Sequence, residues 1–258
     1  MLARAELAAL ARRQGVPLGV VERDYVQHIV LRHVARAPFA FKGGTCVRIA
    51  YGSPRYSEDL DFDADGSAGD ALATLREGGE RLGDYGIRAE VVRRPGPGLE
   101  ATVRYEGPLF DGTPRSRGSI RVDVSLRAGR VDVEEVFVPR TPYADVPQLV
   151  VRALTGAHLL AEKVRALLVR GKPRDLYDVH FLLERGVECR RALLHEKMRL
   201  DRRRFTLRAL DAGIDRVERS WARDLEPLLG GVPPFPAVAR PVRTGVRRLA
   251  RSGAGPPR

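Results

Sequence analysis

The chain has 258 residues, of which 43% are hydrophobic and 30% are charged. A chain of this length folds as one large domain or two small ones, and its composition supports a substantial core, which excludes wholesale disorder. No window approaches about eighteen uncharged apolar residues, so the sequence predicts no membrane span.

The cysteine content predicts a reducing compartment. Cys46 and Cys189 are the two cysteines, and they form no metal-type cluster. The first residues carry charges at helical spacing rather than the apolar core of a secretion signal. We therefore predict a cytoplasmic protein.

The formal net charge is +12, and four of the 45 basic residues are lysine: Lys42, Lys163, Lys172 and Lys197. Such a charge attracts polyanions, of which nucleic acid is the commonest. The shortage of lysine indicates that a preference for arginine codons explains part of the excess. Codon preference explains only part of the positive charge, and the charge still favours contact with nucleic acid.

Apolar spacing predicts helices and strands in alternation over the first half. Residues 1–36 carry two stripes at helical spacing, and residues 57–63 alternate polar and apolar side chains as a strand does. The other predicted elements are a short strand at 39–41, helices at 46–51 and 68–85, and strands at 87–93, 101–105, 119–126 and 131–138.

The pattern turns helical after residue 156. Helices are predicted at 157–170, 173–184, 190–198, 205–212 and 215–228. Residues 231–258 hold six arginines, six prolines and no acid, which predicts a weakly structured basic tail. The predicted fold class is α/β (α+β), with an α/β domain over 1–150, a helical domain over 151–230 and the tail over 231–258.

Asp59 and Asp61 are the first candidate metal ligands. On a strand, side chains two residues apart point to the same face, so both carboxylates could hold a divalent cation such as Mg²⁺. Asp63 lies on the same face, so the sequence does not fix which of these carboxylates would bind the cation. Acid pairs on exposed strands are common, so a solvated strand face is the alternative reading.

Gly43 and Gly44 follow a short apolar strand and precede a short helix. Paired glycines let the backbone approach a triphosphate, whose charge the start of a helix favours. The alternative is an ordinary strand-to-helix turn. Asp123 lies between apolar residues on a later strand, where a third carboxylate could complete a two-metal site and accept a proton from an attacking hydroxyl. An exposed strand acid is the alternative for Asp123.

Three blocks together resemble the AbiEii/AbiGii toxin family: Lys42-Gly43-Gly44-Thr45, the run from Arg55 to Phe62, and the segment from Glu162 to Asp178. The resemblance covers roughly residues 40 to 185. It implies a polymerase-β-like nucleotidyltransferase sheet, Mg²⁺ (two ions) and a nucleoside triphosphate substrate. It also implies a toxin of a toxin–antitoxin or phage-defence system, with an antitoxin encoded by a neighbouring gene. Some relatives are understood to add nucleotides to the tRNA 3′ end.

The resemblance also implies individual roles. Lys42, Gly43, Gly44 and Thr45 match the nucleotide-binding turn, although Thr45 stands where broader nucleotidyltransferases often have serine. Ser57 and Asp59 match an active-site pair, and Asp61 matches the second metal acid. Lys163 matches a triphosphate-binding lysine, and Asp178 matches a late catalytic acid. Spacing alone leaves a structural explanation open for the Lys163–Asp178 segment, because charged pairs on helices are common.

The leading hypothesis is a toxin that transfers nucleoside monophosphate to RNA, with the tRNA 3′ end as the acceptor. Arginines of the helical half are expected to hold the acceptor's phosphates, and the candidates are Arg202, Arg203 and Arg204. One alternative keeps the enzyme but changes the acceptor to a protein or a small molecule. Another is a catalytically inactive nucleic-acid-binding protein, which intact Asp59, Asp61 and Lys163 argue against.

Overall fold

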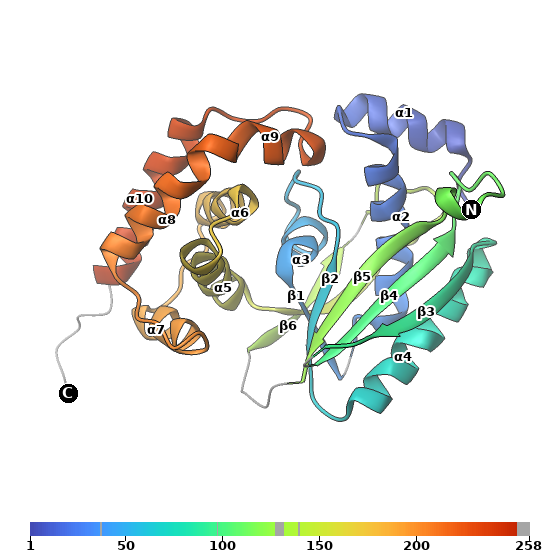
Figure 1. The fold of residues 1–258 in the computed structure, drawn as a ribbon, viewed down its shortest axis with the longest axis horizontal. Helices are drawn as coiled ribbons and strands as arrows, with labels where there is room; N and C mark the ends of the chain where they lie inside the picture. Colours follow the sequence, from blue (N-terminus) through green and yellow to red (C-terminus); the bar gives the residue numbers. More distant parts are fainter. Residues whose placement is uncertain (37, 97, 127–131, 139, 252–258) are drawn as a thin grey trace. The chain divides into compact units, whose positions relative to one another are not determined.

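The computed structural model describes residues 1–36, 38–96, 98–126, 132–138 and 140–251 (Figure 1). Its contacts divide the chain into two compact units. The first unit comprises Met1–Leu154 with Leu228–Gly230, and the second comprises Thr155–Pro227 with Gly231–Arg258. No helix of the described residues is long and apolar enough to cross a membrane.

The first unit is built on a seven-stranded mixed sheet in the order β3-β4-β5-β2-β1-β7-β6. The strands are β1 (Phe39–Lys42), β2 (Leu60–Ala64), β3 (Arg88–Arg94), β4 (Leu99–Glu106), β5 (Gly118–Ser125), β6 (Val133–Val138) and β7 (Leu149–Leu154). The β1–β7 and β2–β5 pairs are parallel, and the remaining neighbours are antiparallel. This mixed sheet with its helices confirms the predicted fold class.

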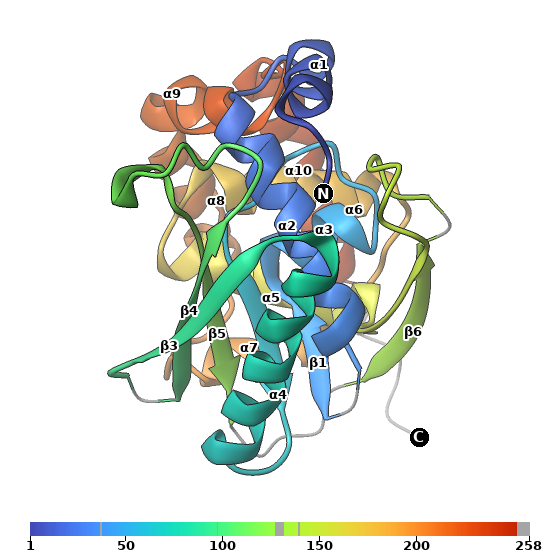
Figure 2. The ribbon, with the colours of Figure 1, turned by 90° about the vertical axis from the view of Figure 1, so that its right-hand side faces the viewer.

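The helices of the first unit are α1 (Arg4–Gln14), α2 (Leu18–Val34), α3 (Gly43–Ile49) and α4 (Ala68–Glu80), with 3-10 turns at η1 (Arg81–Tyr85) and η2 (Pro114–Ser116). Helices α2 and α4 pack against one face of the sheet (Figure 2). Alternate strand residues such as Phe62, Val122 and Val103 are buried beneath them. The intervening residues of β4 and β5 are left on the opposite, open face.

The second unit is helical, as predicted. It contains α5 (Gly156–Val169), α6 (Pro173–Glu184), α7 (Arg191–Arg199), α8 (Leu207–Val217), α9 (Trp221–Leu225) and α10 (Phe235–Arg251), with a short turn at η3 (Glu218–Ser220). A further short turn, η4 (Glu226–Leu228), ends on Leu228, which is counted with the first unit. Pro173 occupies the first turn of α6, where its missing N–H has no partner to lose. Helix α5 packs against α6, α7 and α8, and α10 packs against α6 and α8.

The expectation of a weakly structured tail is wrong for Phe235–Arg251, which form a helix. Its apolar side chains recur at helical spacing and are buried: Val238, Ala239, Val242, Val246, Leu249 and Ala250. Burial of this stripe outweighs the cost of Pro241 inside the helix. The arginine and proline content obscured the period of three to four residues. Residues 252–258 lie outside the described part of the chain.

Three further features of the secondary structure differ from the sequence prediction. Strand β2 begins at Leu60, so Ser57 and Asp59 precede the strand. Strand β7 was not predicted, although its first four residues alternate between buried and more exposed side chains. The predicted helices at 205–212 and 215–228 divide differently, because α8 continues through Gly213 to Val217. Gly213 lies inside this helix, against the backbone of Leu167. A Cβ at Gly213 would stand 3.1 Å from the carbonyl oxygen of Leu167, so the glycine allows α8 to pack closely there.

Candidate active site

The turn from β1 into α3 lies directly against the predicted metal acids. Gly43 has φ +79°, and a Cβ there would stand 2.0 Å from Oδ2 of Asp61. A Cβ on Gly44 would stand 2.7 Å from Oγ of Ser57 and 2.7 Å from an Nη of Arg55. The absence of a Cβ at these two glycines therefore leaves the space that the side chains of Asp61, Ser57 and Arg55 occupy. This holds in addition to any contact of the glycines with a phosphate.

Gly43→Ala is accordingly expected to displace the Asp61 carboxylate and remove nucleotide transfer. The left-handed φ adds about 1–2 kcal/mol of backbone strain. Gly86→Ala is the matched control, because Gly86 has φ +70° and a Cβ there meets nothing within 4 Å. Melting temperature and label transfer should fall together in Gly43→Ala, whereas Gly86→Ala should lose stability alone. Equal transfer by the two variants would show that Asp61 does not depend on this turn.

Asp61 and Asp123 face each other across the parallel β2–β5 pair. Their Cα atoms are register partners, as are those of Glu100 and Asp123 on the β4–β5 pair. Burial, followed by the charges of Glu100 and Asp59, raises the pKa of Asp123. A crowd of carboxylate oxygens on one sheet face suits a hard divalent cation, which would relieve the repulsion between them. Asp61 and Asp123 are therefore ligands of the chemical type that the predicted metal takes.

The raised pKa of Asp123 carries a stability prediction. Its ordinary value is 3.8, and a raised value in the folded state means that ionisation at higher pH costs stability. Asp123→Asn should therefore raise the melting temperature at pH 7, and the gain should vanish below the ordinary value, where both states are protonated. Thermal melts across this pH range measure the effect. An unchanged or lower melting temperature at pH 7 would contradict it.

The carboxylate of Asp59 is turned toward a cation of the same sheet face. Arg121 donates from Nε to Oδ1 of Asp59 at 3.0 Å and from an Nη to Oδ2 at 3.4 Å. Over the described residues, no three His, Cys, Asp or Glu side chains converge as a ready metal site. Asp59 would therefore have to leave Arg121 to join Asp61 and Asp123. Their assignment as joint ligands stays a prediction.

Asp63, the third acid of this face, pairs with a lysine. Lys42 Nζ lies 2.5 Å from Oδ1 of Asp63, and both side chains are largely buried. Thr45 likewise uses its hydroxyl within the protein, since it donates to the carbonyl oxygen of Asp59 at 2.5 Å. Lys42 and Thr45 thus shape the turn and the approach to β2, and nucleotide contacts by either remain a prediction.

Helix α2 supplies residues that sequence reasoning missed. Gln27 is fully buried and donates to the carbonyl oxygens of Ser57 at 3.3 Å and Glu58 at 3.0 Å. Arg23 pairs with the Glu58 carboxylate at 3.1 Å. These side chains, rather than a neighbouring strand, hold the segment before β2, which explains why the strand starts late. Buried polar residues within the apolar stripe of α2 were the available signal.

A second contact from α2 holds the loop before Ser57. The buried carboxylate of Asp24 pairs with Nε of Arg48 at 2.5 Å and accepts a hydrogen bond from Tyr143 at 2.7 Å. Burial opposes ionisation, but the charge of Arg48 prevails and lowers the pKa of Asp24. Arg48 in turn donates to the carbonyls of Ser53 and Pro54, both at 3.2 Å. The segment that carries Ser57 and Asp59 is therefore anchored at both ends.

The remaining predicted catalytic residues belong to the second unit. Lys163 on α5 and Asp178 on α6 form a buried ion pair, with Nζ 2.7 Å from Oδ2. The side chain of Lys163 is 7% exposed and that of Asp178 is 0% exposed. A buried pair of this kind fixes the position of both groups, because loss of either partner leaves an uncompensated charge. Arg202, Arg203 and Arg204 lie exposed in the turn between α7 and α8.

The first unit thus brings paired glycines, a serine and carboxylates together beside one mixed sheet. The model of the family described as nucleotidyl transferase AbiEii toxin, Type IV TA system, matches residues 27–244. The chain belongs to this family. It is therefore a nucleotidyltransferase toxin of a toxin–antitoxin system, and the resemblance found in the sequence is confirmed.

Solved structures share the fold at low identity. MenT4, a nucleotidyltransferase toxin from Mycobacterium tuberculosis H37Rv, is 21% identical, covers 97% of this chain and 90% of its own, and gives a TM-score of 0.73. A candidate nucleotidyltransferase from Helicobacter pylori is 17% identical, with coverage of 91% and 96% and a TM-score of 0.62. JHP933 from Helicobacter pylori is 16% identical, with coverage of 92% and 94% and a TM-score of 0.57. No curated protein sequence matches the chain.

Proposed function

We propose that this toxin transfers a nucleoside monophosphate from a nucleoside triphosphate to the 3′ end of tRNA and thereby inhibits translation. The observation that carries the proposal is the joining of Gly43, Gly44, Ser57 and Asp61 at one turn, with Asp123 in register beside them. The +12 net charge supports a polyanionic acceptor over a small molecule.

Asp59, Asp61 and Asp123 are the residues that would hold Mg²⁺, in one or two ions. When bound, the metal neutralises triphosphate charge and lowers the pKa of the acceptor hydroxyl. Asp123 is suited to accept the hydroxyl proton, because its raised pKa favours proton uptake. The acceptor oxygen then bonds to the α-phosphorus as the bond to the bridging oxygen breaks, and pyrophosphate leaves.

Lys163 has the role of balancing charge on the departing pyrophosphate, which a compact ammonium group does well. Asp178 orients it through the 2.7 Å contact and is thus a positioning residue. The antitoxin partner that the family implies is proposed to come from a neighbouring gene. A phage-defence role and a cytoplasmic location also stay predictions.

The acceptor is tested with bulk tRNA whose 3′-terminal diol has been cleaved by periodate. Transfer of label from an α-labelled triphosphate to intact tRNA, and its loss on oxidised tRNA, would support the 3′ end as the acceptor. Equal labelling of both tRNAs would place the acceptor elsewhere on the RNA. Label on added protein, with none on RNA, would favour the protein-modifying alternative.

A further inference from the structure

The open face of β3, β4 and β5 carries a set of arginines that the proposed chemistry does not use. Strand register and alternation place these side chains on the face opposite α2 and α4. We call this set the arginine face, and its members are Arg88, Arg94, Arg104, Arg117 and Arg121. Three glutamates of β3 and β4 lie among them, Glu90, Glu100 and Glu106.

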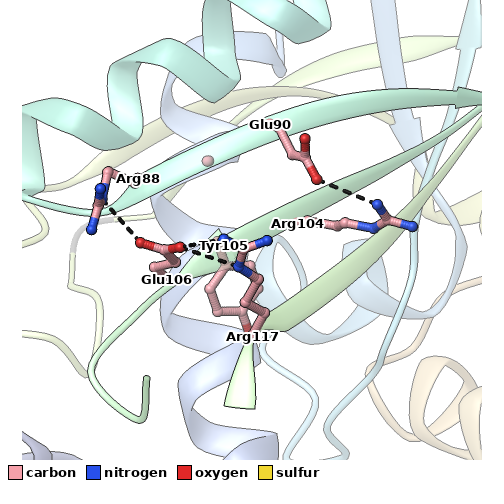
Figure 3. A pocket seen from close by; sticks show the side chains of 7 residues that line it. Arg88, Glu90, Arg104, Tyr105, Glu106 and Arg117 are labelled. Atoms are coloured by element: carbon pink, nitrogen blue, oxygen red, sulfur yellow. Dashed lines mark hydrogen bonds and ion pairs between the residues drawn. The ribbon is translucent and has the colours of Figure 1, made fainter. Parts of the chain in front are cut away.

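The arginine face contains a cleft of about 240 Å³ at the ends of these strands. Arg88, Arg104 and Arg117 line it, with Glu90 and Glu106 between them (Figure 3). Arg88 and Arg117 both contact Glu106, at 2.9 and 2.8 Å, and Arg104 contacts Glu90 at 3.3 Å. The cleft is therefore lined by cations that are already ordered by neighbouring acids.

The arginine face leads directly to the candidate active site. Arg121 and Asp123 lie on one side of β5, and Arg117, the residue before the strand, contacts Glu106 on the same face. Alternate residues of a strand are about 6.6 Å apart. Arg121 is thus one such step from Asp123, and Arg117 is about 20 Å from it. Cations at these intervals can follow a phosphate backbone that ends at the acids.

The chemistry of this face favours a polyanion over a protein. The side chains of Arg88, Arg104, Arg117 and Arg121 are 87%, 55%, 47% and 56% exposed. Glu90, the partner of Arg104, is 57% exposed, and an ion pair this exposed contributes about 0–1 kcal/mol, so a phosphate can replace Glu90 at little cost. Glu106 is 14% exposed but has two arginine partners, so it keeps one when the other turns to a phosphate. In the described chain, the exposed large apolar side chains Met1, Phe137, Val150 and Leu200 all lie outside this face. The apolar centre typical of protein interfaces is therefore missing from it.

We infer that the arginine face binds the phosphate backbone of the RNA acceptor and directs its 3′ end to Asp61 and Asp123. The inference rests on the proposed function and deepens it, because it assigns the acceptor's binding surface to the sheet of the first unit. It also competes with the sequence expectation that Arg202, Arg203 and Arg204 hold the acceptor.

The test is the binding of labelled bulk tRNA, without triphosphate, over a series of salt concentrations. Arg104→Gln with Arg117→Gln should weaken binding about tenfold at 0.1 M salt and lower the salt slope by about 1.4–1.8, as expected for two lost phosphate contacts. Arg76→Gln with Arg81→Gln removes the same charge from α4 and η1, which pack with α2 on the other side of the sheet. This control should change affinity less than about twofold.

A substitution of opposite sign sharpens the test. Glu90→Gln frees Arg104 from its partner and should tighten tRNA binding more than Glu77→Gln, which removes an exposed acid from α4. Equal affinities and slopes for the two double variants would overturn the inference. A loss confined to a combined Arg202→Gln, Arg203→Gln and Arg204→Gln variant would overturn it as well and assign the acceptor to the α7–α8 turn.

Failure of the proposed function gives a different result. In that case the wild-type protein transfers no label to RNA in a parallel incubation with α-labelled triphosphates, whatever its tRNA affinity. If only the inference about the arginine face is wrong, the wild-type protein still transfers label to RNA, and the Arg104/Arg117 double variant binds tRNA with the wild-type affinity.

Discussion

Asp59→Ala and Asp61→Ala are each expected to abolish nucleotide transfer while the first unit stays folded. Asp61 lies against Gly43 and in register with Asp123, so its loss removes one of the proposed oxygen ligands of the metal. Asp59 gives up only a contact with Arg121, whose side chain is 56% exposed, and such contacts stabilise a fold weakly. Incorporation of label from an α-labelled triphosphate in the presence of Mg²⁺ is the measurement, with melting temperature alongside.

Asp65→Ala is the matched control for these variants. Asp65 is an exposed acid that directly follows β2 and takes no part in the contacts that hold the site. It should retain transfer. Turnover by Asp59→Ala at the wild-type level would remove Asp59 from the active site.

Lys163→Ala is expected to reduce turnover at least about a hundredfold, the scale of losing one preorganised electrostatic group. It should also destabilise the second unit, because Asp178 would keep a buried charge without this partner, at a cost of about 3–5 kcal/mol. The Lys163→Ala, Asp178→Ala double variant should recover much of the stability and none of the turnover. Lys163→Arg should rescue little transfer, since the guanidinium has a different shape.

Lys197→Ala separates catalysis from folding in this unit. Lys197 is also buried and pairs with Glu162 at 2.9 Å. Its removal should cost stability, while turnover per folded molecule stays near the wild-type level. Full activity of Lys163→Arg, or equal loss of turnover in Lys197→Ala and Lys163→Ala, would indicate that Lys163 supports the fold alone.

The sequence predicted the alternating sheet well because its signal is local. Apolar residues at every second position of β5 and β2 indicated which side chains would be buried, and this placed Asp61 and Asp123 on the open face. Pro173 and the helical period likewise predicted α6 with its observed bounds. The sequence did not predict α10, because its arginines and prolines obscure the helical period of its apolar residues.

The partners of the site residues could not be predicted, because they depend on contacts between distant segments. Thr45 and Asp59 are fourteen residues apart, and Gln27 and Glu58 are thirty-one residues apart. The contact of Asp59 with Arg121 spans sixty-two residues. No local period reports such pairings, so the sequence indicated the acids but not what holds them in place.

Helix α10 also changes how the basic C-terminal segment is understood. Arg243 and Arg247 pair with Asp211, at 2.7 and 2.6 Å, and Arg243 also pairs with Asp215. Part of the charge that the sequence assigned to RNA binding is therefore used within the second unit. Removing residues 231–258 would expose the apolar surfaces that α10 covers, so substitutions of single charges are the appropriate probes of RNA binding.

We propose above that the chain transfers the α-phosphoryl group, with its nucleoside, to RNA. The decisive measurement is incubation of the protein with bulk tRNA, Mg²⁺ and a triphosphate labelled at either the α- or the γ-phosphate. We expect α-label on tRNA and release of γ-label as pyrophosphate, with both signals absent in Asp61→Ala. Label from the γ-phosphate on tRNA, or no label on tRNA from any of the four triphosphates, would contradict it.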